Sequence, residues 1–149
     1  MGSHRRLVAL AALVVALSAL GGCGGGGSSG GKVEVRLTDY DVILSTMSVG
    51  AGTVDFAIDN TGGFVHELLV VRSDLAIDAL PKTADGRFDE QGPGVTVVAS
   101  AEDIAAGAKA TLSEKLRTGG YFLICNRPAE PGDTLSHFAH GMLSPFTVS

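Results

Sequence analysis

The chain has 149 residues, of which 45% are hydrophobic, and it carries a formal net charge of -5 at pH 7. A chain of this length forms one small globular domain and leaves room for a short additional segment. The excess of acidic residues argues against a nucleic-acid partner, because a phosphate backbone would be repelled.

The first 23 residues have the order of a secretory signal. A basic start, His4-Arg5-Arg6, precedes an uncharged apolar run at 7–20, which ends in Leu20-Gly-Gly-Cys23. The run is shorter than the ~20 residues of a membrane-spanning helix. Its ending resembles the lipobox of bacterial lipoproteins, which implies cleavage before Cys23 and a lipid on that residue. We therefore expect residues 1–23 to be a signal peptide with a lipobox cysteine; an ordinary signal peptide or an uncleaved anchor would also place the domain outside the cytoplasm.

Residues 24–31 are all glycine or serine, which predicts a flexible tether between the lipid and a domain at 32–149. Removal of the leader takes away Arg5 and Arg6, so nine of the 11 basic residues remain against 16 acidic ones and the charge becomes -7. We expect an extracytoplasmic protein, anchored to the bacterial cell membrane by lipid, whose acidic surface favours basic partners.

Residues 32–149 have the pattern of short strands separated by turns. Lys32–Thr38 and Gly52–Asp59 alternate polar and apolar residues, which predicts strands with one buried face. Glu67–Arg72 is almost continuously apolar, which predicts a strand buried on both faces. Further strands are expected at Val42–Val49, Val95–Ala99, Lys109–Leu116, Tyr121–Cys125 and Phe146–Ser149.

The segment Leu75–Gly94 interrupts this pattern. It contains proline, glycine and acidic residues, which predicts a long excursion with one helical turn. Many short strands with little helix indicate an all-β domain, and specifically a β-sandwich.

Sulfur and nitrogen donors gather near the C-terminus. Without the leader the chain keeps three histidines, and two of them, His137 and His140, lie with Met142 on the connection that follows Cys125. Thiolate, imidazole and a weak thioether suit copper. We therefore expect a mononuclear copper site here, to which the remaining histidine, His66, can add an imidazole.

Cys125 is left unpaired if Cys23 carries a lipid, because the chain has two cysteines. Such a thiol in an oxidising compartment has two explanations. It is either a small apolar residue of the core, as free cysteine often is, or a metal ligand. The histidines and the methionine nearby favour the ligand.

Three motifs, in this order, resemble the cupredoxin family of blue copper proteins, and within it the plastocyanin-like and sulfocyanin-like lipoproteins. The first is Asn60-Thr-Gly-Gly-Phe-Val-His66, in which the histidine follows a turn at the edge of a strand. The second is Tyr121-Phe-Leu-Ile-Cys125, in which the cysteine ends a strand. The third is His137-Phe-Ala-His-Gly-Met142, with a closing strand behind it. The resemblance covers nearly all of 32–149 and implies a cupredoxin-like Greek-key β-sandwich.

The resemblance also implies that His66, Cys125 and His137 surround copper and that Met142 is a long axial ligand that tunes the reduction potential. Family members commonly place two to four residues between the cysteine and the second histidine, whereas eleven intervene here. This leaves open whether His140 replaces His137 and whether the metal is more exposed. The spacing of five positions to Met142 favours His137.

By resemblance we expect a one-electron carrier that makes transient contacts with a redox donor and a redox acceptor. The alternative is a copper-binding module for copper handling or delivery, which uses the same ligands. A small apolar patch around His137 would suit a transient interface. Its residues would be Leu135, Phe138, Ala139, Gly141 and Leu143.

We expect no enzymatic activity. A catalytic copper centre of the oxidase or nitrite reductase type needs more histidines, and only His140 remains after His66 and His137. Zinc hydrolysis through Cys125, His137 and His140 is conceivable, but no general base accompanies them. Within the expected domain at 32–149 a Gly-x-Ser-x-Gly nucleophile motif does not occur either.

Overall fold

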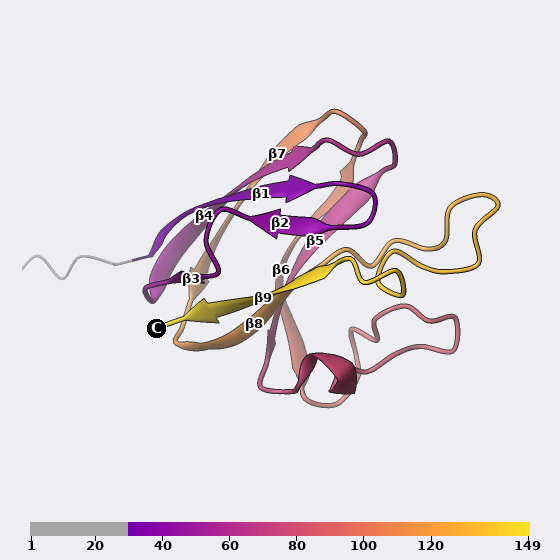
Figure 1. Cartoon of the computed structure of the whole chain (residues 1–149). Helices are drawn as coiled ribbons and strands as arrows, with labels where there is room; N and C mark the ends of the chain where they lie inside the picture. Colours follow the sequence, from indigo (N-terminus) through magenta and orange to yellow (C-terminus); the bar gives the residue numbers. More distant parts are fainter. Residues whose placement is uncertain (1–29) are drawn as a thin grey trace, which may run out of the picture.

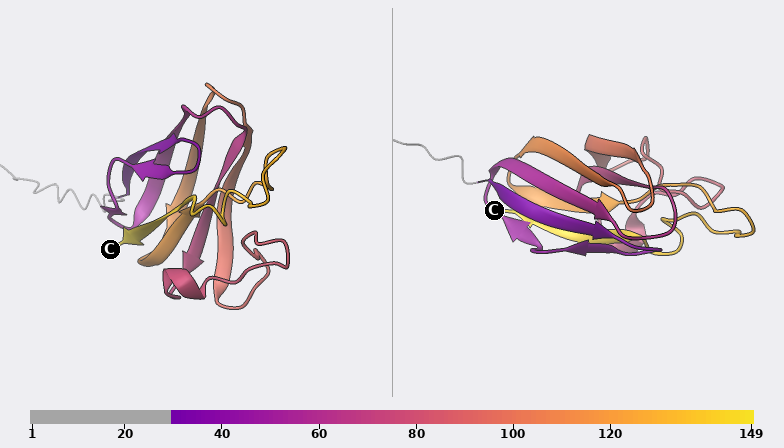
Figure 2. Two further views of the ribbon diagram at one scale, coloured as in Figure 1. Left: turned by 45° about the vertical axis from the view of Figure 1, so that its right-hand side comes forward. Right: turned by 90° about the horizontal axis from the view of Figure 1, so that it is seen from above.

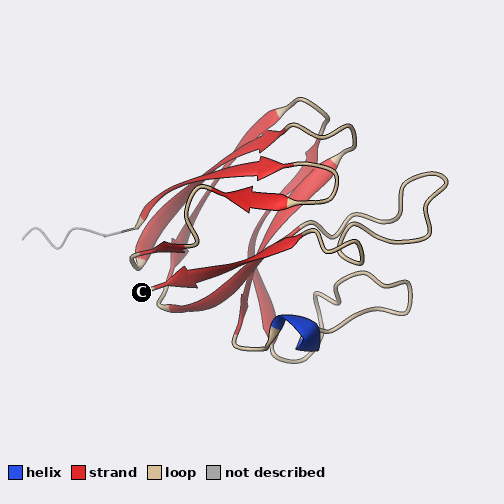
Figure 3. Ribbon diagram, in the orientation of Figure 1, coloured by secondary structure: helices blue, strands red, loops and turns tan. Residues whose placement is uncertain are grey.

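The computed structural model describes residues 30–149 of the chain, which form two β-sheets packed face to face (Figures 1 and 3). The four-stranded sheet has the order β2-β1-β4-β7 and the five-stranded sheet has the order β3-β9-β8-β5-β6. The strands of the first sheet are β1 (Gly31–Leu37), β2 (Val42–Leu44), β4 (Gly52–Asn60) and β7 (Lys109–Leu116). Those of the second are β3 (Ser48–Val49), β5 (His66–Ser73), β6 (Val95–Ile104), β8 (Gly119–Ile124) and β9 (Leu143–Val148).

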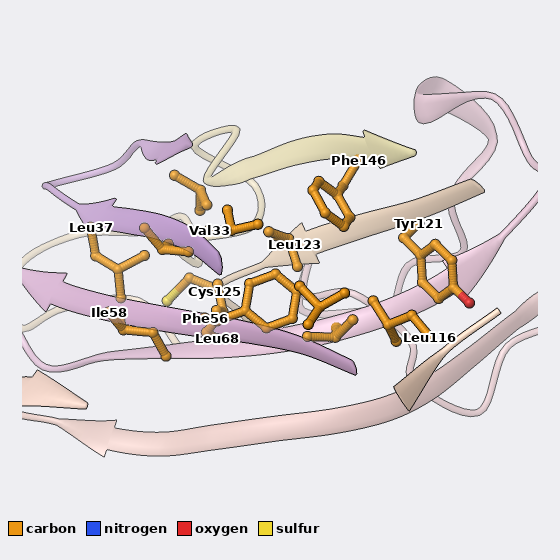
Figure 4. Packing of buried hydrophobic residues seen from close by; sticks show 14 of the residues in the cluster. Val33, Leu37, Phe56, Ile58, Leu68, Leu116, Tyr121, Leu123, Cys125 and Phe146 are labelled. Atoms are coloured by element: carbon orange, nitrogen blue, oxygen red, sulfur yellow. The ribbon is translucent and has the colours of Figure 1, made fainter. Parts of the chain in front are cut away.

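The main core lies between the two sheets. Alternate residues of β1 and β4 are buried, as the polar and apolar alternation predicted. Phe56 of β4 meets Phe146 of β9 edge to face, with ring centroids 5.8 Å apart, so aromatic packing joins the sheets. Figure 4 shows both rings in this core, together with Cys125.

The five-stranded sheet is buried on its outer face as well. Leu69, Val71 and Phe122 project from β5 and β8 into a second apolar cluster, which Leu80 and Phe88 complete from the segment between β5 and β6. The strand buried on both faces is therefore confirmed. The predicted excursion is also confirmed, and its helical turn is the 3-10 helix η1 (Ile77–Ala79).

Three of the predicted strands were wrong in extent by three residues or more. Val42–Val49 is two strands: β2 pairs with β1, and β3 pairs with β9 of the other sheet. The chain crosses between the sheets at 45–47, where the N–H of Ser45 donates to the carbonyl of Glu34. The strand predicted at Val95–Ala99 continues to Ile104, and the strand predicted at Phe146–Ser149 begins at Leu143.

Two long loops extend from the same side of the sandwich, at 75–94 and 126–136 (Figures 1 and 2). Hydrogen bonds from Ser136 to the Gly86 carbonyl and between Asn126 and Phe88 hold them side by side. Among residues 30–149, no helix is long and apolar enough to span a membrane. The predicted signal peptide at 1–23, and all but the last two residues of the tether at 24–31, lie outside the described residues.

Candidate metal centre

Two neighbouring strands bring a histidine and a cysteine to the same end of the five-stranded sheet. His66 is the first residue of β5, and Cys125 follows the last residue of β8. The two strands are antiparallel, with Leu69 opposite Ile124, so the start of one lies beside the end of the other. The backbone N–H of Glu67 donates to the sulfur of Cys125 at 3.5 Å.

A tight turn before β5 fixes the position of His66. The side-chain amide of Asn60 donates to the carbonyls of Phe64 and Ile104 at 2.9 and 2.8 Å, and its oxygen accepts from the N–H of Gly62 at 3.0 Å. Asn60 is fully buried, and these bonds satisfy its polar atoms. The turn that Asn60-Thr-Gly-Gly predicted is therefore present, and the side chain of Asn60 stabilises it.

His137 completes a compact triangle of donor atoms. The Cys125 sulfur lies 3.7 Å from Nδ1 of His66 and 3.4 Å from Nδ1 of His137, and the two nitrogens are 3.0 Å apart. All three residues are fully buried. A triangle with these sides has its centre about 2 Å from each corner, which is the length of a metal–nitrogen bond. The three residues can therefore hold one metal ion.

Met142 is tied to two of these residues through its backbone. Its carbonyl accepts from the N–H of Cys125, and its N–H donates to the carbonyl of His137, both at 3.0 Å. Gly141 precedes it with φ +94°, a conformation that favours glycine. The Met142 side chain is fully buried in the same core cluster as Cys125.

The structure brings His137, and not His140, to the cysteine. The ring of His140 stacks on Tyr40 with centroids 4.0 Å apart, and its Nε2 pairs with the carboxylate of Asp133 at 2.7 Å. A quarter of its side chain is exposed. It lies outside the buried group of His66, Cys125 and His137.

Each of the two buried histidines has a carboxylate at its other nitrogen. Nε2 of His66 lies 2.9 Å from Oδ1 of Asp39, and Nε2 of His137 lies 3.0 Å from Oε1 of Glu130. Burial tends to raise the pKa of Asp39, but hydrogen bonds from the Gly63 backbone and from His66 hold it below its ordinary value. The carboxylate of Asp39 is therefore ionised and accepts a hydrogen bond from Nε2–H.

The buried donors differ in whether a proton must leave before a metal binds. Burial lowers the pKa of His137 against the opposing effect of Glu130, which favours the neutral imidazole that a metal needs. Burial raises the pKa of the Cys125 thiol to about 11. Without metal the thiol keeps its proton at neutral pH, and metal binding must release that proton.

The loop between Cys125 and His137 is closed over the site, and the open metal that its length suggested is not what the structure shows. The Asn126 N–H donates to the Glu67 carboxylate at 3.0 Å, and the N–H of His137 donates to the carbonyl of Arg127 at 3.1 Å. His137 has no exposed surface.

The predicted apolar patch around His137 is only partly at the surface. Phe138 is buried against Phe88, and Leu143 is half-buried. Leu135, Ala139 and Gly141 are exposed.

Sequence reasoning missed the two carboxylates behind the histidines and the aromatic ring beside them. Asp39 lies between β1 and β2, far from the motifs, and Glu130 is one of many acidic residues. The Tyr40 ring meets His137 edge to face, with centroids 5.1 Å apart. No spacing in the sequence singles out these residues, because the fold alone brings them to the site.

The donor set of one sulfur and two imidazole nitrogens, with a buried methionine beside it, points to copper. Zinc accepts histidine and cysteine, but two histidines and a cysteine together with a weak methionine ligand are typical of blue-copper electron-transfer sites.

No family model and no curated protein matches the sequence. Solved structures do match the fold. Reduced auracyanin from Roseiflexus castenholzii has 20% identity and a TM-score of 0.55, covering 83% of this chain and 99% of its own. Rusticyanin from Thiobacillus ferrooxidans has 18% identity and a TM-score of 0.53, covering 81% and 79%.

An azurin from Methylomonas sp. strain J matches with 19% identity and a TM-score of 0.51, over 79% of this chain and 97% of its own. These three proteins are cupredoxins. At such identities the likeness concerns the fold, and the predicted all-β class is confirmed with it. The chain therefore has the cupredoxin fold, with a histidine, cysteine and histidine cluster at one end of its β-sandwich.

Proposed function

We propose that this chain is a mononuclear type 1 (blue) copper protein that carries single electrons outside the cytoplasm. His66, Cys125, His137 and Met142 would hold the copper, and the weak thioether of Met142 would help to tune its reduction potential. The main support is the buried triangle of one sulfur and two nitrogens, whose centre lies at bonding distance from all three. Its partners would be a redox donor and a redox acceptor that dock transiently.

The protein's part in electron transfer is to hold the ligands still. Bound copper would supply one-electron chemistry by alternating between Cu(I) and Cu(II). His66 and Cys125 sit at strand ends, and His137 sits on a loop that hydrogen bonds fix to the sheet. Rigid elements limit the rearrangement of ligands during electron exchange. Complete burial of the three side chains would keep water away from a bound metal.

The alternative is a module for copper handling or delivery with the same ligands. A delivery site needs a path along which copper leaves, and mobile ligands would provide one. Here the loop is pinned at Asn126, Arg127 and Ser136, and His137 is fully buried. These contacts favour the carrier. We propose no enzymatic activity, because among residues 30–149 only His140 would remain to build a second copper site.

The carrier and the delivery module differ in how they hold copper. We expect the full chain, given one equivalent of Cu(II), to show an intense visible band, to lose it on reduction with dithionite and to regain it on reoxidation. Copper per chain, measured after desalting, should stay at one in both states. Loss of reduced copper to a Cu(I) chelator at low concentration would indicate delivery instead, and a colourless copper adduct would contradict the blue-copper assignment.

We further propose that Cys23 carries a lipid that anchors the domain to the cell membrane from outside, with 24–31 as tether. The support is the order of the basic start, the apolar run and Leu20-Gly-Gly-Cys23. Replacing Cys23 with serine should prevent lipid attachment and the cleavage before residue 23. The native chain should extract from the membrane fraction only with detergent and show a mass increase from lipid on Cys23. An unmodified Cys23 in the membrane-bound chain would contradict the lipid anchor.

A further inference from the structure

The two carboxylates behind the histidines reach the site from different parts of the chain. Asp39 stands in the connection between β1 and β2, and Glu130 stands in the loop between Cys125 and His137. Their side chains are 31% and 23% exposed, so both are partly shielded from solvent. Each points at the Nε2 atom of one buried histidine, at 2.9 and 3.0 Å.

The pair of Asp39 and His66 is built into the fold. The second oxygen of Asp39 accepts from the backbone N–H of Gly63 at 2.8 Å, in the turn before β5. A Cβ atom on Gly62 would stand 2.3 Å from Oδ1 of Asp39 and 2.9 Å from Nε2 of His66. Glycine at 62 therefore leaves the space in which this hydrogen bond forms.

The pair of Glu130 and His137 gives a role to the long loop. His137 donates its backbone N–H to Arg127, so the loop turns back on itself and brings Glu130 to the outer nitrogen of the ring. Tyr40 and Phe64 lie beside the same ring, with centroids 5.1 and 6.3 Å away. These aromatic groups lower the local dielectric, which strengthens the effect of a nearby charge.

The carboxylates set which nitrogen faces the metal. An ionised carboxylate only accepts hydrogen bonds, so the Nε2 atom that it contacts must carry the proton. Nδ1 then presents its lone pair, and both Nδ1 atoms do face the Cys125 sulfur. A carboxylate behind a ligand histidine also makes the imidazole more basic, and its negative charge favours the more highly charged metal.

On the basis of the proposed function, we propose that Asp39 and Glu130 are positioning residues of the copper site: they orient both ligand histidines through Nε2–H and lower the reduction potential by stabilising Cu(II) over Cu(I). The long loop would thus cover the metal site and also place the negative charge of Glu130 beside His137.

The test uses variants that remove charge and keep shape, Asp39→Asn and Glu130→Gln, in the full chain. Each should shift the ratio of Cu(I) to Cu(II) affinity by roughly tenfold toward Cu(I), which is a potential about 59 mV higher for one electron. The matched control is Asp133→Asn. This residue is in the same loop and pairs with His140, which is outside the donor group. Its variant should move the ratio by no more than about twofold, because its carboxylate contacts His140 instead of a donor histidine, and screening weakens a charge that does not touch a ligand.

A redox titration that follows the blue band gives the reduction potential of the native chain and of the three variants. The differences in potential measure the effect of each carboxylate charge. Equal shifts of the potential in all three variants, or no shift in any, would overturn the proposed role of Asp39 and Glu130. The blue-copper proposal would still stand in that case, because the blue band supports it independently. Gly62→Ala adds a check without any change of charge: it should raise the potential by displacing Asp39 from His66. An unchanged potential in a folded, copper-binding Gly62→Ala protein would count against the role of Asp39.

A second measurement does not depend on copper or on colour. In the chain loaded with Zn(II), nitrogen NMR should find His66 and His137 protonated at Nε2 and bound to metal through Nδ1. The Nε2–H protons should exchange faster with solvent in Asp39→Ala and Glu130→Ala, respectively. Metal on Nε2 of either ring would overturn the orientation, whether or not the blue-copper proposal holds.

Discussion

Replacing Cys125 with serine should abolish the intense visible absorption of the copper-loaded chain. That absorption requires charge transfer from a thiolate to Cu(II), and a serine hydroxyl keeps its proton and supplies no sulfur. Serine is close to cysteine in size, so the fully buried site should keep its shape. Copper affinity should fall by more than about 100-fold, because loss of a supporting hydrogen bond alone costs 10–100-fold. Visible spectroscopy and competition with a copper chelator measure the two effects.

The control for this experiment is Cys23→Ser, which removes the only other cysteine. It should leave the visible band and the copper affinity unchanged. If the Cys125→Ser chain kept an intense blue band, the sulfur could not be its source, and Cys125 would be a core residue that happens to lie beside two histidines.

Several strands could be predicted from the sequence because each has one solvent-exposed face and one buried face. The alternation in Lys32–Thr38 and Gly52–Asp59 predicted β1 and β4 to within one residue at each end. Lys109–Leu116 coincides with β7. Successive side chains of a strand point to opposite faces of the sheet, so in these segments the alternation of apolar and polar residues shows which face is buried. Little information about the tertiary structure is needed to predict them.

Other strands depend on information that alternation does not contain. Val42–Val49 divides between two sheets, and no local pattern says which sheet a short apolar segment joins. β6 runs on through Ser100 and Glu102, both of which are exposed. Polar side chains on a strand at the edge of its sheet are compatible with backbone pairing to β5, but in the sequence they resemble the end of a strand.

The donor residues were predictable because their types are rare in this chain. One unpaired thiol near two of the few histidines is an unusual concentration, and the family spacing then favoured His137 over His140. The supporting carboxylates were not predictable. Asp39 and Glu130 belong to the 16 acidic residues of the chain, and only the folded backbone decides which of these face a histidine.

The comparison of His137→Ala with His140→Ala tests the donor group most directly. We expect His137→Ala to lower copper affinity by more than about 100-fold, since a ligand should matter more than the groups that support it. The blue band should be lost or strongly altered. His140→Ala should keep the band and an affinity within about threefold of the native chain, because substitutions away from a binding site change free energies by less than about 0.5 kcal/mol.

The two variants are closely matched, which makes the comparison decisive. Both histidines lie on the same loop, both contact the ring of Tyr40, and each pairs its Nε2 with a carboxylate of that loop, Glu130 or Asp133. Both variants therefore lose a contact with Tyr40 and a pair with a loop carboxylate. They differ in burial, which is complete only for His137, and in position: Nδ1 of His137 is 3.4 Å from the Cys125 sulfur, whereas His140 is outside the donor group. If copper binding failed in His140→Ala and survived in His137→Ala, the metal would require a rearranged loop, and the triangle of donors would not be its site.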